Sequence, residues 1–240
     1  MYTNTAVMCE HLPKIEQNKK LNLYHLVGYQ ALFILLDYSP GKNYDAVIQE
    51  LCDITPQKLY GKILLHPKNI KELRSQLKSL DKIKDFFISV QSVEKDVLSY
   101  AIKDSRVDLI TCPHIIQLKS ITPGIVSLVK TNQKFIEISL IDALFSKSGE
   151  RSRLFHEVAR FLDTVRNNLH VVLCGGFEQS LNEIRGPREI ASIFTAIFDV
   201  STPMSKSIVQ SNPQRIIAKL CERKDNNCIQ SGVKTQPYTT

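Results

Sequence analysis

The stretch FFISVQSVEKDVLSYAIKDSRVDLITC, residues 86–112, contains the unit from which the fold is predicted. It begins with the apolar run FFISV and ends with a second apolar run, VDLITC. The segment between them places Val93, Val97 and Ala101 on one stripe of a helix. Continuous apolar runs are typical of strands that are covered on both faces. The stretch therefore predicts two parallel strands joined by a crossover helix.

The same unit recurs along the chain. The other apolar runs occupy residues 5–9, 31–36, 62–66, 134–140 and 170–174, with a weaker run at 198–200. Amphipathic segments between them predict helices, with apolar stripes at Leu73, Leu77 and Leu80 and at Leu154, Val158, Phe161, Leu162 and Val165. Eight such units predict an α/β fold, a TIM-like (β/α) barrel. An open doubly wound sheet is the alternative, but no glycine-rich nucleotide-binding motif follows any run.

The chain shows no interdomain linker, so residues 1–223 are predicted to form a single barrel domain. From Lys224 onward large apolar residues are few and no periodicity remains, which predicts a disordered, flexible C-terminal tail over 224–240. The start of the chain does not resemble a targeting peptide, and the longest apolar-rich run, LVGYQALFILL, is too short to span a bilayer. We therefore expect a soluble, cytoplasmic protein with no membrane partner.

Composition limits the functional classes. Hydrophobic residues make up 43% of the 240-residue chain, which is enough for a sizeable core. Lysine and arginine total 31 against 24 acidic residues, and the resulting charge of +7 permits a polyanionic partner. The six cysteines form no C-x-x-C pair, so we expect reduced and mostly buried thiols.

Function in such a barrel gathers where the strands end at their carboxyl side. These positions carry Asp37, His66, Gln91, His114, Ser139 and Gly175–Gly176. Asp37, His66 and His114 could bind a metal or perform acid–base catalysis. The competing interpretation, that each residue caps its own loop, is favoured because no closely spaced histidine pair occurs and acidic residues are scarce at the other strand ends.

Two carboxylates lie inside apolar strands. Asp108 and Glu137 could serve as a general acid or base, or they could form ion pairs in the barrel core, with Arg106 or Arg185 as candidate partners. The structural interpretation is favoured, because a buried carboxylate needs a partner.

Two segments place arginines at the start of a helix. In EIRGPREIASIF, residues 183–194, Pro187 suits the first helical position, and Arg185 and Arg188 flank it. Cations are mildly unfavourable at the positive end of a helix dipole, which favours an anion there. The alternative is that solvent screens them or that Glu183 and Glu189 pair with them.

Arg151 and Arg153 precede another helix in the same manner. Because these segments follow the sixth and seventh strands, we expect the four arginines on one rim, where they could hold phosphates. The alternative is ordinary solvated charge. Lys68, Lys71 and Arg74 form a possible secondary basic patch, or simply the wet face of a helix.

Five segments occur in one order: SRVDLITCP, FIEISL, GERSRLF, EIRGPREIASI and STPMSKSIVQSNPQRIIAKL. In this order and spacing the chain resembles the ribonuclease P protein component 3 family, the archaeal relatives of a eukaryotic nuclear subunit. The resemblance extends well from Asp96 to Leu220 and loosely over 20–95. It departs from the family pattern at CGGF, residues 174–177, which replaces a small Ser-Ser-Gly-Ala turn, and at the opening strand, for which TAVMCEH stands in.

The resemblance implies a barrel related to metal-dependent PHP phosphoesterases, but without their metal-ligand set. It implies a protein subunit of ribonuclease P, the endonuclease particle that removes the 5′ leader of precursor tRNA. The catalyst would be the ribonuclease P RNA with Mg²⁺, and this chain, non-catalytic by itself, would bind no metal and would act with another protein subunit. The RNA-binding residues would be Arg106, Arg151, Arg153, Arg185 and Arg188. A metal-dependent phosphoesterase using Asp37, His66 and His114 is the alternative function.

Overall fold

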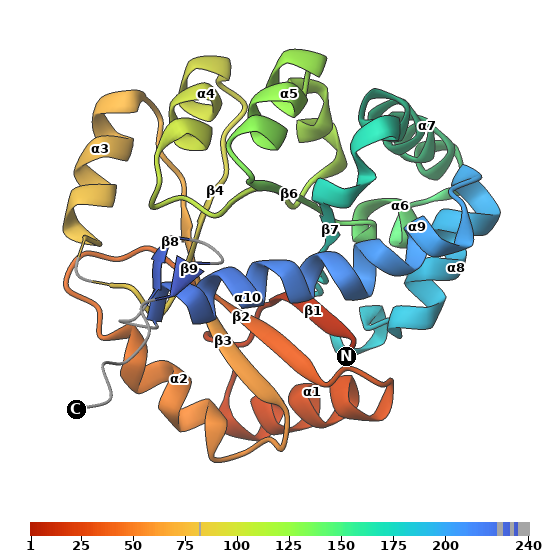
Figure 1. Cartoon of the computed structure of the whole chain (residues 1–240). Coiled ribbons are helices and arrows are strands. Elements are labelled where there is room, and N and C mark those ends of the chain that lie inside the picture. The colour runs from red at the N-terminus through yellow and green to blue at the C-terminus, as the bar shows by residue number, and fades with distance from the viewer. Residues whose placement is uncertain (82, 225–227, 231–232, 235–240) are drawn as a thin grey trace.

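A parallel β-barrel forms the centre of the molecule (Figure 1). The structure is a computed structural model that describes residues 1–81, 83–224, 228–230 and 233–234. The seven strands are β1 (Thr3–Val7), β2 (Ala31–Asp37), β3 (Lys58–Leu65), β4 (Phe87–Val90), β5 (Leu109–Cys112), β6 (Phe135–Ile138) and β7 (Val172–Cys174). Each strand pairs in parallel with the next in chain order. The predicted TIM-like barrel is therefore confirmed, and TAVMCEH includes the last three residues of the opening strand.

The barrel is nearly closed between β1 and the segment after β7. The N–H of Phe177 donates to the carbonyl oxygen of Ala6 at 2.9 Å. The N–H of Gly176 donates to Oδ1 of Asn4, also at 2.9 Å. These two bonds join the first and last strands where an eighth strand would otherwise stand.

The eighth strand predicted at 198–200 was wrong. Phe198 is the last residue of helix α8 (Pro187–Phe198), and Asp199 adopts a left-handed conformation with φ of 52°. The N–H of Val200 then bonds to the carbonyl of Phe194, as is usual where a left-handed residue ends a helix. The Phe198 ring packs against Phe155 with ring centroids 5.7 Å apart. The short apolar run therefore belongs to the end of a helix.

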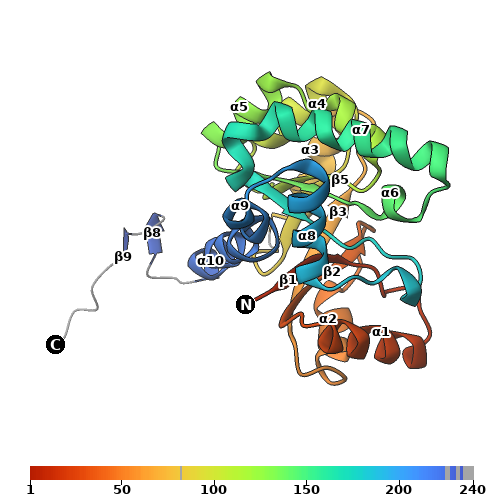
Figure 2. The ribbon, with the colours of Figure 1, turned by 90° about the vertical axis from the view of Figure 1, so that its right-hand side faces the viewer.

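Helices surround the barrel. They are α1 (Lys14–Leu26), α2 (Tyr44–Cys52), α3 (Ile70–Ser79), α4 (Lys95–Lys103), α5 (Pro123–Thr131), α6 (Ile141–Phe145), α7 (Ser148–Val165), α8, α9 (Thr202–Lys206) and α10 (Asn212–Lys224), with short helical turns η1 (Ile115–Ser120), η2 (Arg166–Val171), η3 (Leu181–Glu183) and η4 (Ser207–Ser211). Figure 2 shows α10 at the end of the barrel near the N-terminus and α6 at the opposite end.

The predicted apolar stripes of α3 and α7 are buried, as expected. One residue assigned to a stripe differs. Val93 precedes α4 and is exposed, because the helix begins only at Lys95. Ile197 lies in α8 but is half exposed, so the buried side of that helix is carried by Ile190 and Phe194.

Side chains at alternate strand positions fill the barrel in layers, as the two-residue period of a strand requires. The layer nearest the N-terminal ends of the strands is apolar and consists of Phe33, Phe87, Leu109, Phe135 and Leu173. The middle layer is polar and consists of Lys62, Ser89, Thr111 and Glu137, all fully buried. The layer beneath the C-terminal ends includes Ala6, Leu35, Leu64 and Phe177.

Helix α10 closes the N-terminal end of the barrel. Its buried residues Ile216, Ile217 and Leu220 join the apolar layer of strand residues there. The side-chain amide of Asn212 donates to the carbonyls of Leu169 and Val172, at 3.0 and 2.7 Å. α10 therefore serves as the floor of the barrel.

The same helix supplies the partner of Asp108. Arg223 Nη2 donates to Oδ1 of Asp108, and the N–H of Ile88 donates to Oδ2 at 2.9 Å. The ion pair expected for Asp108 is therefore present. The candidate partners Arg106 and Arg185 were wrong, because the pair is made by a helix 115 residues further along the chain.

The predicted tail over 224–240 lies largely outside the described residues. Lys224 ends α10, and the described part beyond it forms two short antiparallel strands, β8 (Cys228–Gln230) and β9 (Val233–Lys234). Among the described helices, none is long and apolar enough to cross a membrane.

The described cysteines differ in burial, which predicts their reactivity. Burial raises the pKa of Cys9 to about 11 and that of Cys112 to about 12, and it raises that of Cys174 further. Thiolate is the reactive form, and these three remain thiols at pH 7.5. We expect maleimide to label the exposed Cys52 and Cys221 at least about ten-fold faster in the native protein, measured by peptide mass spectrometry. Equal labelling of Cys112 and Cys52 would contradict the described core.

Candidate functional site

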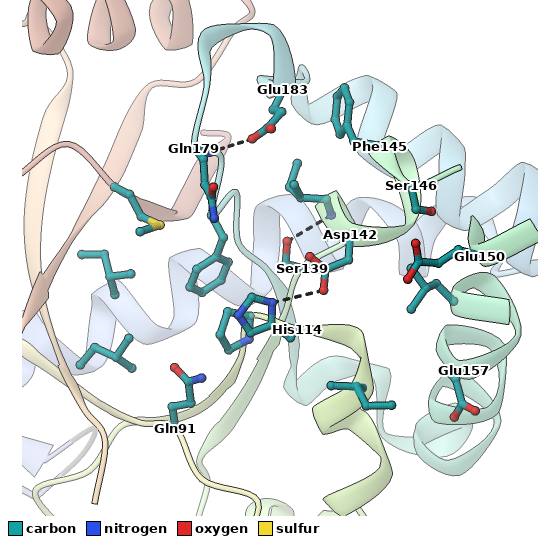
Figure 3. Close-up of a pocket in the computed structure, with 18 of the residues that line it drawn as sticks. Gln91, His114, Ser139, Asp142, Phe145, Ser146, Glu150, Glu157, Gln179 and Glu183 are labelled. Carbon is teal, nitrogen blue, oxygen red and sulfur yellow. Dashed lines mark hydrogen bonds and ion pairs between the residues drawn. The ribbon is translucent and has the colours of Figure 1, made fainter. Parts of the chain in front are cut away.

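A cavity of about 790 Å³ opens at the C-terminal ends of the strands (Figure 3). Its lining includes Asp37, His66, Gln91, His114 and Ser139, from the ends of successive strands. The structure therefore brings these five strand-end residues to one cavity. Cavities of this size at this end of a barrel are where such folds usually bind ligands. We call this cavity and its rim the barrel mouth.

The histidines of the barrel mouth form two separate pairs with carboxylates. His66 Nε2 lies 3.4 Å from Oδ1 of Asp37, and His114 Nδ1 lies 3.3 Å from Oδ2 of Asp142. Asp142 also accepts from the N–H of Ile115. Asp142 was not predicted as a site residue, because it lies in a helix after a strand end, at a position that no motif marks.

The donor set of the barrel mouth does not fit a metal centre. Among the described residues, no group of three histidine, cysteine or carboxylate side chains is arranged to hold an ion. Strand ends that would have to supply further ligands carry Gln91, Pro113, Ser139 and Phe177. Metal-dependent hydrolysis needs several converging carboxylates and imidazoles. The phosphoesterase alternative is therefore not favoured.

The floor of the barrel mouth is apolar. Leu35, Leu64 and Phe177 line the cavity from below and pack with Ala6. Phe177 has φ of 57°, a left-handed conformation that is costly for a bulky side chain. Its backbone bond to Ala6 holds it there, so its ring covers the polar layer beneath.

That polar layer centres on a buried ion pair. Lys62 Nζ lies 2.7 Å from both carboxylate oxygens of Glu137, and neither side chain is exposed. Lys62 also donates to the carbonyl of Thr5, and the Thr111 hydroxyl donates to Glu137 Oε2 at 2.9 Å. Burial lowers the pKa of Lys62, and Glu137 opposes that shift. The ion pair expected for Glu137 is confirmed, but its partner is Lys62 rather than an arginine.

The Gly175–Gly176 turn is required by close packing. A Cβ at Gly175 would lie 2.7 Å from the Phe177 ring and 2.8 Å from Cβ of Ala6, and one at Gly176 would overlap the carboxylate of Glu178. Glu178 is buried and accepts from the hydroxyl of Tyr24. Burial raises the pKa of Glu178. Close packing therefore requires glycine at both positions of this turn, which departs from the family pattern.

The rim of the barrel mouth is acidic. Of the described side chains that line it, the carboxylates are Asp37, Asp142, Glu150, Glu157 and Glu183, and the lysine and arginine are Lys119 and Arg153. Lys119 lies 3.4 Å from Glu157, and Arg153 lies 3.6 Å from Glu150. Both cations therefore already face a carboxylate of the same rim.

Two predicted arginines meet beside this acidic rim, at the turn between α6 and α7. The prediction that Arg151 and Arg153 precede a helix was wrong, because α7 begins at Ser148 and contains both. The guanidinium of Arg185 lies over the ring of Phe145, 4.8 Å from its centroid. Arg151 donates through Nη2 and Nε to the carbonyl of Ser146, at 2.9 and 3.2 Å. Because Phe145 and Ser146 are consecutive, the structure brings these two arginines to one turn.

The glutamates that could have neutralised Arg185 and Arg188 are used elsewhere. Glu189 accepts from the N–H of Gly186 at 2.9 Å, and Glu183 accepts from the N–H of Gln179 at 2.7 Å. Of the residues that the structure describes, none forms a carboxylate ion pair with either arginine. Arg188 is exposed in the first turn of α8. The pairing with Glu183 and Glu189 that was left open is therefore not made.

The structure places the remaining basic candidates apart from this turn. Arg106 lies just before β5, at the opposite end of the barrel, and is paired with Asp81 at 2.5 Å and Asp104 at 2.7 Å. Lys68 and Lys71 are exposed near the start of α3, where Arg74 lies 4.8 Å over the Tyr100 ring.

One further set of cations was missed. Arg215 and Lys219 of α10 both lie 5.5 Å from the centroid of the Phe135 ring. Burial lowers the pKa of Lys219, and the neighbouring Arg215 lowers it further. Their four-residue spacing in the sequence was the available signal.

The fold and this site define a TIM-like barrel with an acidic mouth and two arginines at the turn between α6 and α7. Similar solved structures include a phosphotriesterase homology protein from Escherichia coli complexed with phosphate (10% identity, 89% of this chain and 97% of that chain, TM-score 0.58). They also include a chain of an archaeal ribonuclease P with mature tRNA (14% identity, 99% of each chain, TM-score 0.79). The profile of the RNase P subunit p30 family matches residues 6–225, and the chain belongs to that family. No curated protein sequence matches the chain.

Proposed function

We propose that this chain, as a protein subunit of ribonuclease P, binds RNA phosphates through Arg151, Arg185 and Arg188. The archaeal assembly that it resembles contains tRNA. In this proposal the RNA of the particle, with Mg²⁺, removes the 5′ leader of precursor tRNA. The chain itself stabilises the folded RNA together with another protein subunit.

The observation that carries this proposal is the pair of arginines without carboxylate partners at the start of α8. In the described structure Glu183 and Glu189 satisfy backbone N–H groups, which leaves the charge of Arg185 and Arg188 to an external anion. A cation at a helix N-terminus is disfavoured by the dipole, by roughly 0.3–1 kcal/mol. A phosphate bound there makes the electrostatic free energy of this arrangement favourable, because both the helix N-terminus and the guanidinium attract the phosphate.

The two arginines at the α6–α7 turn are already oriented. Arg185 Nη1 donates to the carbonyls of Asn182 and Ile184, both at 2.9 Å. A guanidinium has about five N–H donors. Arg185 and Arg151 thus have more donors than their protein contacts use, and a phosphate can bind without first ordering the side chains.

The test is the salt dependence of binding to the cognate RNA. Each phosphate contact contributes about 0.7–0.9 to the slope of log affinity against log salt concentration. We expect R185A/R188A to reduce this slope by about 1–2, measured by filter binding between about 50 and 300 mM KCl.

The matched control removes two exposed arginines of α7 and η2 that already pair with acidic neighbours. Arg160 lies 3.3 Å from Glu157, and Arg166 lies 3.9 Å from Asp163. R160A/R166A should leave the slope within about 0.3 of that of the unchanged protein. Salt-insensitive binding, or equal losses in the two variants, would exclude the proposed surface. Failure of the chain to increase precursor-tRNA cleavage by the cognate RNA and partner subunit would exclude the function.

A further inference from the structure

The barrel mouth is acidic, whereas the chain as a whole is basic. The protein carries a net charge of +7, yet five carboxylates and two cations line the mouth among its described residues. Since both cations lie within 3.6 Å of a rim glutamate, the carboxylates are in excess. An RNA phosphate would be repelled there, so the RNA-binding surface proposed above does not extend into the mouth.

The exposed apolar side chains of the protein gather at the same place. Met8, Ile116 and Phe145 line the mouth and are each more than a third exposed. Val93 and Leu181 are also exposed, and each stands two residues from a lining side chain, Gln91 and Gln179 respectively. Three of the eight large apolar side chains that the structure shows as exposed therefore line the mouth, and such a grouping marks an interaction surface rather than scattered exposure.

The floor of the mouth is apolar, which is a third property of this surface. Beneath the rim the floor is formed by Leu35, Leu64 and Phe177, so a side chain that enters meets apolar surface. Burial of a large apolar side chain there stabilises the complex, because it removes apolar surface from water. An apolar anchor in a pocket, surrounded by a charged rim, is the usual anatomy of a protein–protein interface.

We infer that the barrel mouth is the docking site of a basic protein partner, which inserts an apolar side chain between Leu35, Leu64 and Phe177 and sets lysine or arginine side chains against the rim carboxylates. The inference rests on the proposed function, because it requires a second protein of the same RNA-binding particle. Such a protein is basic for the reason that this chain is basic. The docking site and the arginine surface then meet at the α6–α7 turn, where Phe145 faces the mouth and also carries Arg185.

The first test locates the contact in the assembled particle. A photo-crosslinking phenylalanine derivative is placed at Ile116, in the mouth, and in a separate protein at Ile15, which is exposed on α1 and does not line the mouth. The particle is reconstituted from the full chain, the cognate RNA and the partner protein. We expect irradiation to join position 116, but not position 15, to the basic partner protein. A crosslink from 116 to RNA or to a second copy of this chain, or no crosslink at all, overturns the inference.

The second test removes two rim charges by substitution and measures the affinity for the partner protein, with no crosslinking group attached. Asp37 and Glu150 are rim carboxylates whose side chains are more than half exposed. D37N/E150Q should weaken binding of the partner protein by about five-fold, measured by calorimetry. The control E50Q/D163N removes two exposed carboxylates outside the mouth and should change that affinity by less than about two-fold. Equal effects of the two variants overturn the inference.

The two proposals can fail separately. D37N/E150Q leaves Arg151, Arg185 and Arg188 in place, so the salt slope for RNA should be unchanged within about 0.3. Loss of partner binding with an unchanged RNA slope supports the docking site. An altered RNA slope in this variant would mean that RNA enters the mouth, and that also overturns it.

Discussion

Lys62→Met is expected to lower the free energy of unfolding by about 3–5 kcal/mol, the largest effect of any single substitution considered for this protein. Lys62 and Glu137 are both fully buried and face each other at 2.7 Å inside the barrel. Removing the lysine leaves the glutamate charge buried in the barrel without its counter-ion. Urea unfolding followed by circular dichroism at pH 7 measures the change.

The double variant K62M/E137Q is the control for this account. The neutral glutamine can still accept the Thr111 hydroxyl, which in the native protein lies 2.9 Å from Glu137. Because no unpaired charge remains, we expect the double variant to recover at least about half of the stability that Lys62→Met removes. A loss below about 1 kcal/mol in the single variant, or strictly additive losses in the double variant, would contradict a strongly coupled pair.

Arg223→Met is expected to lower the free energy of unfolding by about 2–3 kcal/mol at pH 7. Arg223 donates to the buried carboxylate of Asp108 and is itself partly exposed, so the effect is smaller than that of Lys62→Met. The substitution also loosens the end of α10. R223K, which keeps the charge, is the matched control and should recover part of the loss.

The effect of Arg223→Met should depend on pH in a defined direction. Burial already raises the pKa of Asp108, and Arg223 opposes that shift, so removing the arginine raises the pKa further. The folded variant then holds the Asp108 proton more tightly than the unfolded chain does. Stability therefore falls as pH rises from the unfolded pKa, about 3.9, through the folded pKa. The deficit of Arg223→Met should be larger at pH 7 than at pH 4.5, and an equal deficit at both would show that Asp108 is not the cause.

Much of this architecture could be predicted from the sequence because it depends on local periodicity. Seven apolar runs correspond to β1–β7, and the stripe of Leu73 and Leu77 faces the core as expected. The strand-end residues Asp37, His66 and His114 line the mouth, since parallel strands necessarily bring these positions to one edge. The eighth strand failed because a three-residue apolar run does not distinguish a strand from the end of a helix.

The partners of buried charges could not be predicted. Glu137 meets Lys62 from three strands earlier, and Asp108 meets Arg223 from the last helix, so both pairs depend on the closed barrel rather than on spacing in the chain. Lys62 lies within an apolar run, where a lysine usually marks an exposed position. The acidic character of the mouth likewise arises from Asp142, Glu150 and Glu157 on α6 and α7, which only the fold brings to the rim.

Helix α10, which closes the bottom of the barrel, is synthesised after all seven strands of the barrel. Most of the apolar bottom of the barrel is covered only once Ile216, Ile217 and Leu220 have left the ribosome; of the earlier described residues, the partly buried Met1 and Tyr60 also pack against it. A nascent chain that has completed all seven strands still presents five large apolar side chains at that end. Premature termination before residue 212 should therefore yield a fragment with exposed apolar surface, which quality-control proteases recognise and degrade. Such fragments then do not compete with the intact subunit during particle assembly.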